Sequence, residues 1–426
     1  MSRVSLLLVE IRELVTLAPG NTVKRGARQS ELGIIENGAV AIDDRGVIRW
    51  VGPTPQAPID EARADGARII SCEGRSVIPG FVDPHTHTVF AGDRIDEFEQ
   101  ILAGAEYVEL LARGGGIHKT VALTRSCPTE SLVSAATSRL ARMLAAGTTT
   151  VEIKTGYGLD PKEEMRLVDV IGQVRQRTPV EVVGTLLAGH AVPLEWRDRR
   201  NEFLDAICAE LIPSAAQTGI VEYCDVFCEG GAFSPEESRR ILESGLRHGL
   251  RSKIHAEQKS HSGGALVAAD LRACSADHLE YAEEEDLRAL ARAGTIAVLL
   301  PGAALFTREE RRPLTRRMVE LGVPIALGTD FNPGSSPIWS MSTIIGLACL
   351  LFHLTPAEAL VAATVNAACA LGRHQRVGSI EPGKQGDLII LGVPSYRYIP
   401  YYFGASLVET VMKRGQIVVE EGKALP

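Results

Sequence analysis

The stretch VIPGFVDPHTHTVFAGDR, residues 77–94, places two histidines one residue apart at the end of an apolar segment. On a β-strand, residues i and i+2 point to the same face, so His85 and His87 would lie side by side and aim at one point. Two imidazoles in that arrangement form half of a metal site. The alternative is a pair of surface histidines beyond a strand end, and the rest of the chain decides between the two.

The composition is that of a globular protein with an acidic bias. The chain has 426 residues, 45% of them hydrophobic and 23% charged, which suits a large barrel with an appended unit. Its formal net charge of −8 argues against a general nucleic-acid surface and is compatible with a pocket for a small anion. We therefore expect a small-molecule anionic substrate and no nucleic acid as partner.

Eight cysteines are scattered along the chain without a CxxC pair, a distribution that differs from that of disulfide-stapled secreted domains. We interpret them as reduced thiols of a cytoplasmic protein, and Cys224 and Cys228 as buried strand residues rather than metal ligands. The N-terminal segment MSRVSLLLVEIRELV carries Glu10 in its apolar part and lacks a small-residue cleavage site, so it is a poor signal peptide. The longest apolar run, residues 343–354, is too short to span a bilayer, and we expect no membrane association.

Both ends of the chain have the pattern of short strands. Residues 1–75 contain LLLVEI, GAVAIDD, VIRWVG and ARIIS, separated by Gly, Asn and Asp as in an antiparallel sheet. Residues 374–426 contain the similar segments GDLIILGV and VETVMKRGQIVVEEGKAL. Neither end is long enough to bury a core alone. We therefore predict that residues 1–76 and 374–426 meet in one small composite β-sandwich, from which residues 77–373 emerge.

Residues 77–373 alternate short apolar segments with amphipathic helical patterns. Helical periodicity occurs in PKEEMRLVDVIGQVRQR (161–177) and in SPEESRRILESGLRHG (234–249), where Ser234 is a good N-cap and Glu237 follows three residues later. About eight strand–helix units predict an α/β fold, a TIM-type (β/α)8 barrel. The predicted strands are VIPGFVDPHTH (77–87), TTTVEIKTG (148–156), VEVVGTLLAGH (180–190), YCDVFCEGG (223–231), RSKIHAEQ (251–258), CSADHLEY (274–281), TIAVLLPG (295–302) and PIALGTD (324–330).

Chemically active side chains recur where these strands end. The C-terminal ends of TIM-barrel strands meet at one face, where catalytic groups collect. A single histidine at a strand end is usually structural, whereas five histidines and an aspartate at one face indicate a site. Three imidazoles and a carboxylate suit zinc or iron with an open position for water. The residues are His85, His87, His190, His255, His278 and Asp330.

Several motifs together resemble those of one family. The segments PGFVDPHTH, KIHAE, ADHLE and GTDFNPG, with GSIEPGKQGDLIIL near the C-terminus, are similar to those of the amidohydrolase superfamily. The resemblance implies hydrolysis or deamination of a C–N bond on a metal-bearing barrel flanked by a composite β-sandwich. The combination of EIKTGYGLD, SADHLE and DFNPGSSP is more specific. It is similar to members that open the cyclic amide of a carboxylate-bearing imidazolone ring in histidine degradation, and it implies a homodimer.

The resemblance assigns roles to individual positions. It implies one divalent metal ion per chain, zinc or iron, held by His85, His87, His255 and Asp330. Asp330 would also accept the proton of the attacking water, and His278 would orient that water or the developing oxyanion. The implied substrate contacts, among which Arg94 binds the carboxylate, are Arg94, Tyr157, His190, Gln258, Asn332, Gly334 and Ser335.

Two of these assignments leave alternatives open. Gln258 stands where related deaminases carry a proton-shuttling glutamate, and an amide can hydrogen-bond but cannot act as a general acid, which favours hydrolysis over deamination. The adjacent Glu257 shares the face of His255 by strand alternation and stays a candidate for the same place. The alternative interpretation of Arg94 is a surface arginine paired with Asp93, Asp96 or Glu97.

Lys154 ends the second predicted strand, and we interpret it as part of a structural ion pair. The metal-bridging lysine of two-metal relatives belongs to the fourth strand, so one metal is expected. Departures from the expected motifs at Ala188-Gly189, Lys259 and His261 bear on fine substrate preference. Two rival functions are another cyclic-amide hydrolase or aminohydrolase of the superfamily, and a non-catalytic scaffold barrel. Scaffold barrels lose metal ligands, whereas this chain keeps all four.

Overall fold

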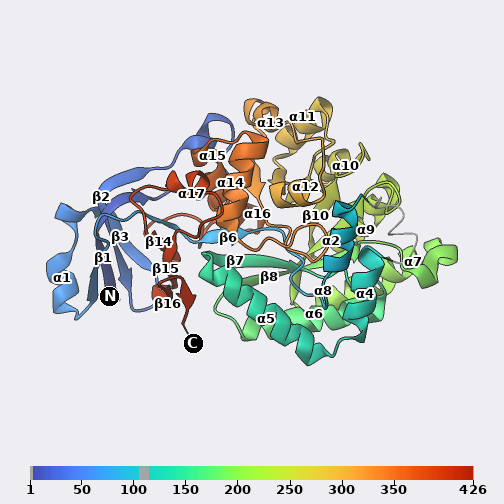
Figure 1. Ribbon diagram of the computed structural model, residues 1–426, viewed down its shortest axis with the longest axis horizontal. Coiled ribbons are helices and arrows are strands. Elements are labelled where there is room, and N and C mark those ends of the chain that lie inside the picture. The colour runs from blue at the N-terminus through green and yellow to red at the C-terminus, as the bar shows by residue number, and fades with distance from the viewer. Residues whose placement is uncertain (1–2, 105–114, 426) are drawn as a thin grey trace.

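Both ends of the chain contribute strands to one sheet, here called the end sheet. The computed structural model describes residues 3–104 and 115–425. Figure 1 shows the N- and C-terminal strands side by side at one end of the molecule, next to the barrel. The order in the end sheet is β17-β16-β15-β14-β5-β1-β2-β3, with β4 paired to β1, which confirms the predicted meeting of the two ends. Its strands are β1 (Val4–Val15), β2 (Ile34–Asp43), β3 (Ile48–Pro53), β4 (Arg68–Ser71), β5 (Val77–Pro79), β14 (Leu388–Leu391), β15 (Val408–Lys413), β16 (Gln416–Glu420) and β17 (Lys423–Ala424).

Side-chain alternation along β1 gives the end sheet two buried faces. Leu6 and Leu8 pack in a cluster that includes Leu388 from the other end of the chain. Leu7, between them, points to the opposite face, where it packs with Ala62 of helix α1 (Ile59–Ala64). The end sheet therefore buries apolar residues from both chain termini.

The middle of the chain forms the predicted barrel. Its eight strands follow one another in sequence order from β6 to β13, and every neighbouring pair is parallel. A bridge between Thr86 and Phe331 connects the segments that follow the first and last strands, and it closes the barrel. The strands are β6 (Phe81–Asp83), β7 (Thr148–Lys154), β8 (Glu181–Gly189), β9 (Val221–Cys228), β10 (Arg251–Ala256), β11 (Ser275–His278), β12 (Ile296–Leu299) and β13 (Ile325–Leu327).

Helices connect consecutive barrel strands. At the start of α9, the Ser234 hydroxyl accepts a hydrogen bond from the Glu237 N–H, and the Glu237 carboxylate accepts one from the Ser234 N–H, which is the capping box that the sequence predicts. The helices are α2 (Ile95–Leu102), α4 (Ile117–Ser126), α5 (Thr129–Ala145), α6 (Pro161–Gln176), α7 (Arg200–Ala206), α8 (Ile212–Gln217), α9 (Pro235–Arg247), α10 (Gly264–Asp270), α11 (Glu284–Ala293), α12 (Pro301–Phe306), α13 (Thr315–Leu321), α14 (Met341–Phe352), α15 (Pro356–Ala362), α16 (Val365–Ala370) and α17 (Tyr398–Tyr401).

The first predicted strand, residues 77–87, is divided in the structure. Its beginning, β5, pairs with β1 and β14 in the end sheet, and its continuation, β6, pairs with β7 in the barrel. Gly80 lies at the change of sheet, where a Cβ atom would approach Thr149 Oγ1 to 2.4 Å. The assignment of residues 77–79 to a barrel strand was wrong, because an apolar run does not reveal where a strand changes sheets. The domain boundaries themselves stay a prediction.

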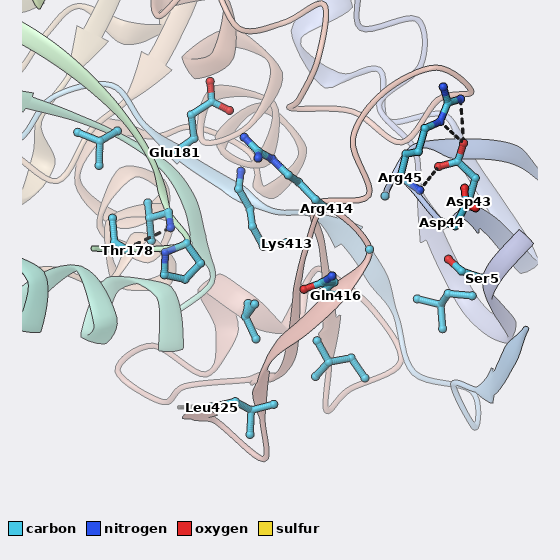
Figure 2. Close-up of a pocket in the computed structure, with 18 of the residues that line it drawn as sticks. Ser5, Asp43, Asp44, Arg45, Thr178, Glu181, Lys413, Arg414, Gln416 and Leu425 are labelled. Carbon is cyan, nitrogen blue, oxygen red and sulfur yellow. Dashed lines mark hydrogen bonds and ion pairs between the residues drawn. The ribbon is translucent and has the colours of Figure 1, made fainter. Parts of the chain in front are cut away.

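A cleft of about 1110 Å³ lies between the end sheet and the barrel. Figure 2 shows Asp43 and Arg45 on the side of the end sheet, and Glu181, the first residue of β8, on the barrel side. The cleft contains none of the predicted site residues, which lie at the other end of the barrel strands. Within residues 3–104 and 115–425, no helix combines the length and the apolarity that a membrane crossing requires.

Candidate active site

Closure of the barrel brings three predicted ligands together. The Asp330 N–H donates to the carbonyl of His85 over 2.9 Å, and the His87 N–H donates to the carbonyl of Phe331 over 3.0 Å. As a result, Asp330 Oδ1 lies 3.5 Å from His85 Nε2 and 3.4 Å from His87 Nε2. All three side chains are buried, and together they can hold a metal ion.

A second group overlaps the first. His85, His255 and His278 also present ligand atoms within 4.8 Å of one another, and the rings of His85 and His255 are 4.5 Å apart. Among the described residues, the four predicted ligands do not form a single group at this separation. His87 and Asp330 belong to the first group, His255 belongs to the second, and His85 belongs to both. The set of His85, His87, His255 and Asp330 therefore stays a prediction, and His278 lies close enough to act on the same centre.

The chemistry of the donor atoms fits a divalent metal. His85 Nδ1 lies 2.6 Å from Asp277 Oδ2, and His255 Nδ1 lies 3.2 Å from Asp225 Oδ1. Each carboxylate accepts the Nδ1 proton and leaves the Nε2 lone pair free to bind a metal, as in carboxylate–histidine–metal triads. His85 Nε2 and His255 Nε2 are buried and have no hydrogen-bond partner among the described residues. A buried polar atom without a partner is costly, and a metal ion satisfies both.

The surroundings favour the neutral form of four of the histidine rings, those of His85, His87, His190 and His278. Burial lowers the pKa of His85, His87 and His278 well below the usual value, and the positive charge of Lys154 adds to this effect. Burial and His255 lower the pKa of His190 to about 4. Neutral imidazoles are the form that binds a metal. Burial raises the pKa of Asp330 to about 7, and a cation bound beside it would favour its ionised form.

The loop after Asp330 places Arg94 at the site. Asn332 Oδ1 accepts hydrogen bonds from the N–H groups of Gly334 and Ser335 over 2.8 and 2.7 Å, and Ser335 Oγ donates to Asp330 Oδ2 over 3.4 Å. The Arg94 guanidinium lies against this turn, because a Cβ atom on Gly334 would be 1.4 Å from Arg94 Nη2. The predicted contacts Arg94, Asn332, Gly334 and Ser335 are therefore close together.

One contact of Arg94 agrees with the alternative interpretation, in which this arginine pairs with a nearby carboxylate. Its Nε lies 3.6 Å from Glu97 Oε2, one of the three carboxylates considered from the sequence. The Arg94 side chain is only 12% exposed, however, so it is not a surface arginine. Its Nε is buried and has no hydrogen-bond partner among the residues the structure describes.

Tyr157 and His190 both lie next to His87. His190 stacks on His87 with 5.3 Å between ring centroids, and its Nδ1 lies 2.8 Å from the carbonyl of Gly156. Tyr157 is buried, and its ring centroid is 5.8 Å from that of His87 and 5.5 Å from that of His190. The two predicted substrate contacts thus place their aromatic rings beside the group formed by His85, His87 and Asp330.

Glu257 turns away from the histidines. Its φ of 53° is left-handed, so strand alternation ends at this residue. Its carboxylate accepts hydrogen bonds from the N–H groups of Ser262 and Ala265 over 2.5 and 2.9 Å. The expectation that Glu257 shares the face of His255 was wrong for this reason. The neighbouring Gln258 is half-buried, and its role stays a prediction.

Comparisons with known proteins agree with this geometry. The sequence profile of the "Amidohydrolase family" matches residues 76–418. The chain belongs to the amidohydrolase family. This amidohydrolase is 46% identical over 424 residues to an imidazolonepropionase from Symbiobacterium thermophilum, a match that covers 99% of both chains. It is 47% identical over 421 residues to an imidazolonepropionase from Geobacillus thermodenitrificans, with 98% of this chain and 99% of the relative covered.

Solved structures share the fold of this amidohydrolase. A zinc-bound adenosine deaminase from Xanthomonas campestris superimposes with a TM-score of 0.71 over 100% of this chain and 95% of its own. The two sequences are 20% identical, so this similarity shows the fold alone. The family and the ligand group together support a divalent metal in the site.

Sequence reasoning missed several residues of this amidohydrolase site. Asp225 contacts His255, and Asp277 contacts His85. Both aspartates lie inside segments that were interpreted as strands, YCDVFC and SADH. The only local signal was an aspartate within a buried strand. Lys154, interpreted as part of an ion pair, does pair with Asp225 over 2.7 Å, which confirms that interpretation.

We predict that Gly334→Ala weakens substrate binding. The alanine Cβ must displace the Arg94 guanidinium, because the two would otherwise overlap. Steady-state kinetics should show KM rising by about tenfold or more, the effect of losing roughly 1.4 kcal/mol of binding. Gly230→Ala is the matched control, since its added Cβ meets its nearest neighbour, Ser260 Oγ, only at 3.8 Å. Equal KM values in wild type and Gly334→Ala would contradict the placement of Arg94.

Proposed function

We infer that the chain is an imidazolonepropionase, a hydrolase of a cyclic C–N bond in the third step of histidine degradation. It opens the cyclic amide of 4-imidazolone-5-propanoate and releases N-formimidoyl-L-glutamate. The observation that carries this function is the 46% identity to a named imidazolonepropionase over 99% of both chains. The direct test is incubation of the purified enzyme with 4-imidazolone-5-propanoate, where the ultraviolet absorbance of the ring should disappear as the product forms.

We propose that His85, His87, His255 and Asp330 hold one divalent ion per chain, zinc or iron. The unpartnered Nε2 atoms of His85 and His255 and the position of Asp330 beside His87 support this set. When bound, such an ion supplies Lewis acidity and lowers the pKa of a coordinated water toward 7.

Three residues carry the proposed chemistry. Asp330 accepts the proton from the attacking water at its carboxylate. His278, buried beside His85 and His255, orients the carbonyl oxygen as negative charge develops on it. The water oxygen bonds to the ring carbonyl carbon, the carbon–nitrogen bond breaks, and the nitrogen leaves with the proton that Asp330 took from the water. Gln258 hydrogen-bonds the ring without supplying that proton.

The substrate carboxylate lies at the Arg94 side of the pocket in this proposal. A guanidinium binds a carboxylate through two parallel hydrogen bonds, and Arg94 Nε has no other hydrogen-bond partner among the described residues. Asn332, Gly334 and Ser335 form the turn that supports Arg94, and Tyr157 lies beside Arg94 in this proposal, with His190 lining the same pocket.

Other hydrolases of this family remain the second candidate. The fold is shared with a deaminase, so a deaminase or another cyclic-amide hydrolase would use the same barrel. The glutamate expected of such a deaminase is replaced by Gln258, and the adjacent Glu257 is engaged by two backbone N–H groups. Substrate profiling with cyclic amides and aminated bases separates these activities. A scaffold without activity would show no turnover of any of them.

We propose further that the protein is cytoplasmic and forms a homodimer. Tyr401, Tyr402 and Phe403 are exposed at one surface, by 77%, 48% and 48%, and aromatic residues of this kind are enriched at protein interfaces. Light scattering of the purified protein measures the molar mass, and a single-chain value of 45.8 kDa would rule the dimer out.

We predict one tightly bound divalent metal per chain. Elemental analysis of active protein should give about one equivalent, and His255→Ala should abolish both the metal and the activity, because an open metal site needs each of its ligands. His248→Ala is the control, since His248 directly follows α9 and its Nδ1 lies 2.9 Å from the Ser244 carbonyl of that helix. Active protein that contains no metal, or two equivalents, would contradict the proposed centre.

We predict that Arg94→Met lowers kcat/KM for 4-imidazolone-5-propanoate by roughly 30- to 5,000-fold. Loss of one partner of a buried charge pair costs about 2–5 kcal/mol, which corresponds to that range. The comparison substrate is an analogue in which a methyl group replaces the carboxylate, and Arg94→Met should lose little activity on it. Equal losses on both substrates would mean that Arg94 supports the loop rather than the carboxylate.

A further inference from the structure

Five charged side chains meet in the interior of the barrel beneath the histidines. Lys154 contacts Glu152 at 2.9 Å, Asp225 at 2.7 Å and Asp277 at 3.8 Å, and Lys253 contacts Glu152 at 2.8 Å. All five side chains are 0% exposed. They come from four strands, β7, β9, β10 and β11, and we call them the buried charge cluster.

The cluster is unusual for this place in a barrel. The interior of a TIM barrel is generally filled by layers of branched apolar side chains. Burying ions is costly, and well-packed hydrophobic residues in place of a buried ion cluster are often neutral or stabilising. Stability alone therefore does not explain the buried charge cluster, and its contacts point to another role.

The contacts of the cluster lead directly to the proposed metal ligands. Asp225 presents Oδ1 to His255 Nδ1 and Oδ2 to Lys154 Nζ. Asp277 presents Oδ2 to His85 Nδ1, and the same oxygen lies 3.8 Å from Lys154 Nζ. Lys154 thus stands between two aspartates that also contact His255 and His85.

The other lysine holds the backbone of the same segment. Lys253 Nζ donates to the carbonyl of Pro84, directly before His85, over 2.8 Å, and to Glu152 Oε1 over 2.8 Å. Although burial opposes its charge, the carboxylates of Asp225, Glu152 and Asp277 raise the pKa of Lys154 above its usual value. Lys154 is therefore an ammonium group that can bind both aspartates at once.

We propose that Lys154 is a positioning residue, which holds Asp225 and Asp277 against His255 and His85 and thereby fixes the direction of both Nε2 atoms. The proposal rests on the metal site described under the proposed function. It concerns metal affinity, which can be measured without substrate. Partners of this kind typically change metal affinity by about 10- to 100-fold when they are removed.

The experiment measures Zn²⁺ affinity of the metal-free protein by competition with a chromophoric chelator. Lys154→Met should bind Zn²⁺ about 10- to 100-fold more weakly than wild type. It should also change the visible absorption bands of bound Co²⁺, which report ligand geometry. Lys413→Met is the matched control, because it removes a buried lysine from a 2.5 Å pair with Asp387 in the end sheet. That variant should keep the wild-type affinity and Co²⁺ spectrum.

A double variant keeps the test valid if Lys154→Met does not fold. Lys154→Met with Glu152→Gln removes one positive and one negative charge, so the net charge of the cluster is unchanged. The glutamine oxygen can still accept from Lys253. This double variant should still bind Zn²⁺ more weakly, whereas Glu152→Gln alone, which keeps Lys154 between the aspartates, should bind as wild type does.

The outcomes separate this proposal from the proposed function. Wild-type protein that binds no Zn²⁺ would remove the metal site and this proposal with it. Wild-type protein that binds Zn²⁺, with wild-type affinity in the folded Lys154 variants, would overturn the role of Lys154 alone. A loss of affinity in Lys413→Met equal to that in Lys154→Met would also overturn it, because the effect would then be general destabilisation.

Discussion

The barrel closes through two backbone hydrogen bonds, from Asp330 to His85 and from His87 to Phe331, and the site depends on their register. A shift of one residue in a strand pairing turns every side chain to the other face. A slip at this closure would therefore separate Asp330 from His85 and His87, which now lie 3.5 and 3.4 Å from it. The same two hydrogen bonds therefore close the barrel and place Asp330 next to His85 and His87.

Three residues at the ends of strands that carry the site have a strained backbone. Asp330, His278 and Glu257 have φ angles of 51°, 83° and 53°, in the left-handed region that non-glycine residues seldom adopt. Such conformations cost on the order of 1–3 kcal/mol each and persist where the surrounding structure enforces them. They redirect side chains that an extended strand would place elsewhere. Glu257 shows the result, since its carboxylate binds the loop at Ser262 instead of facing the site.

The sequence was most informative where the pattern was local. The alternation of short strands with helical patterns predicted the barrel, the histidines at strand ends predicted the position of its site, and the capping box at Ser234 predicted the start of α9. The change of sheet at Gly80 was not predictable, because it depends on the distant Thr149 and on β14. The link from Lys154 to Asp225 and Asp277 was also hidden, since it joins three strands whose relative positions no local pattern reveals.

The end sheet is joined to the first barrel strand, and so to the segment that carries His85 and His87, through the short connection at Gly80. β5 is held between β1 and β14, so both ends of the chain hold the residues directly before β6. Lys253 holds the same segment from the other side through the Pro84 carbonyl. His85 and His87 therefore follow a segment that is fixed at both of its ends. A metal site gains affinity when its ligands are held in place before binding, and here the composite sheet and the buried charge cluster both contribute to that rigidity.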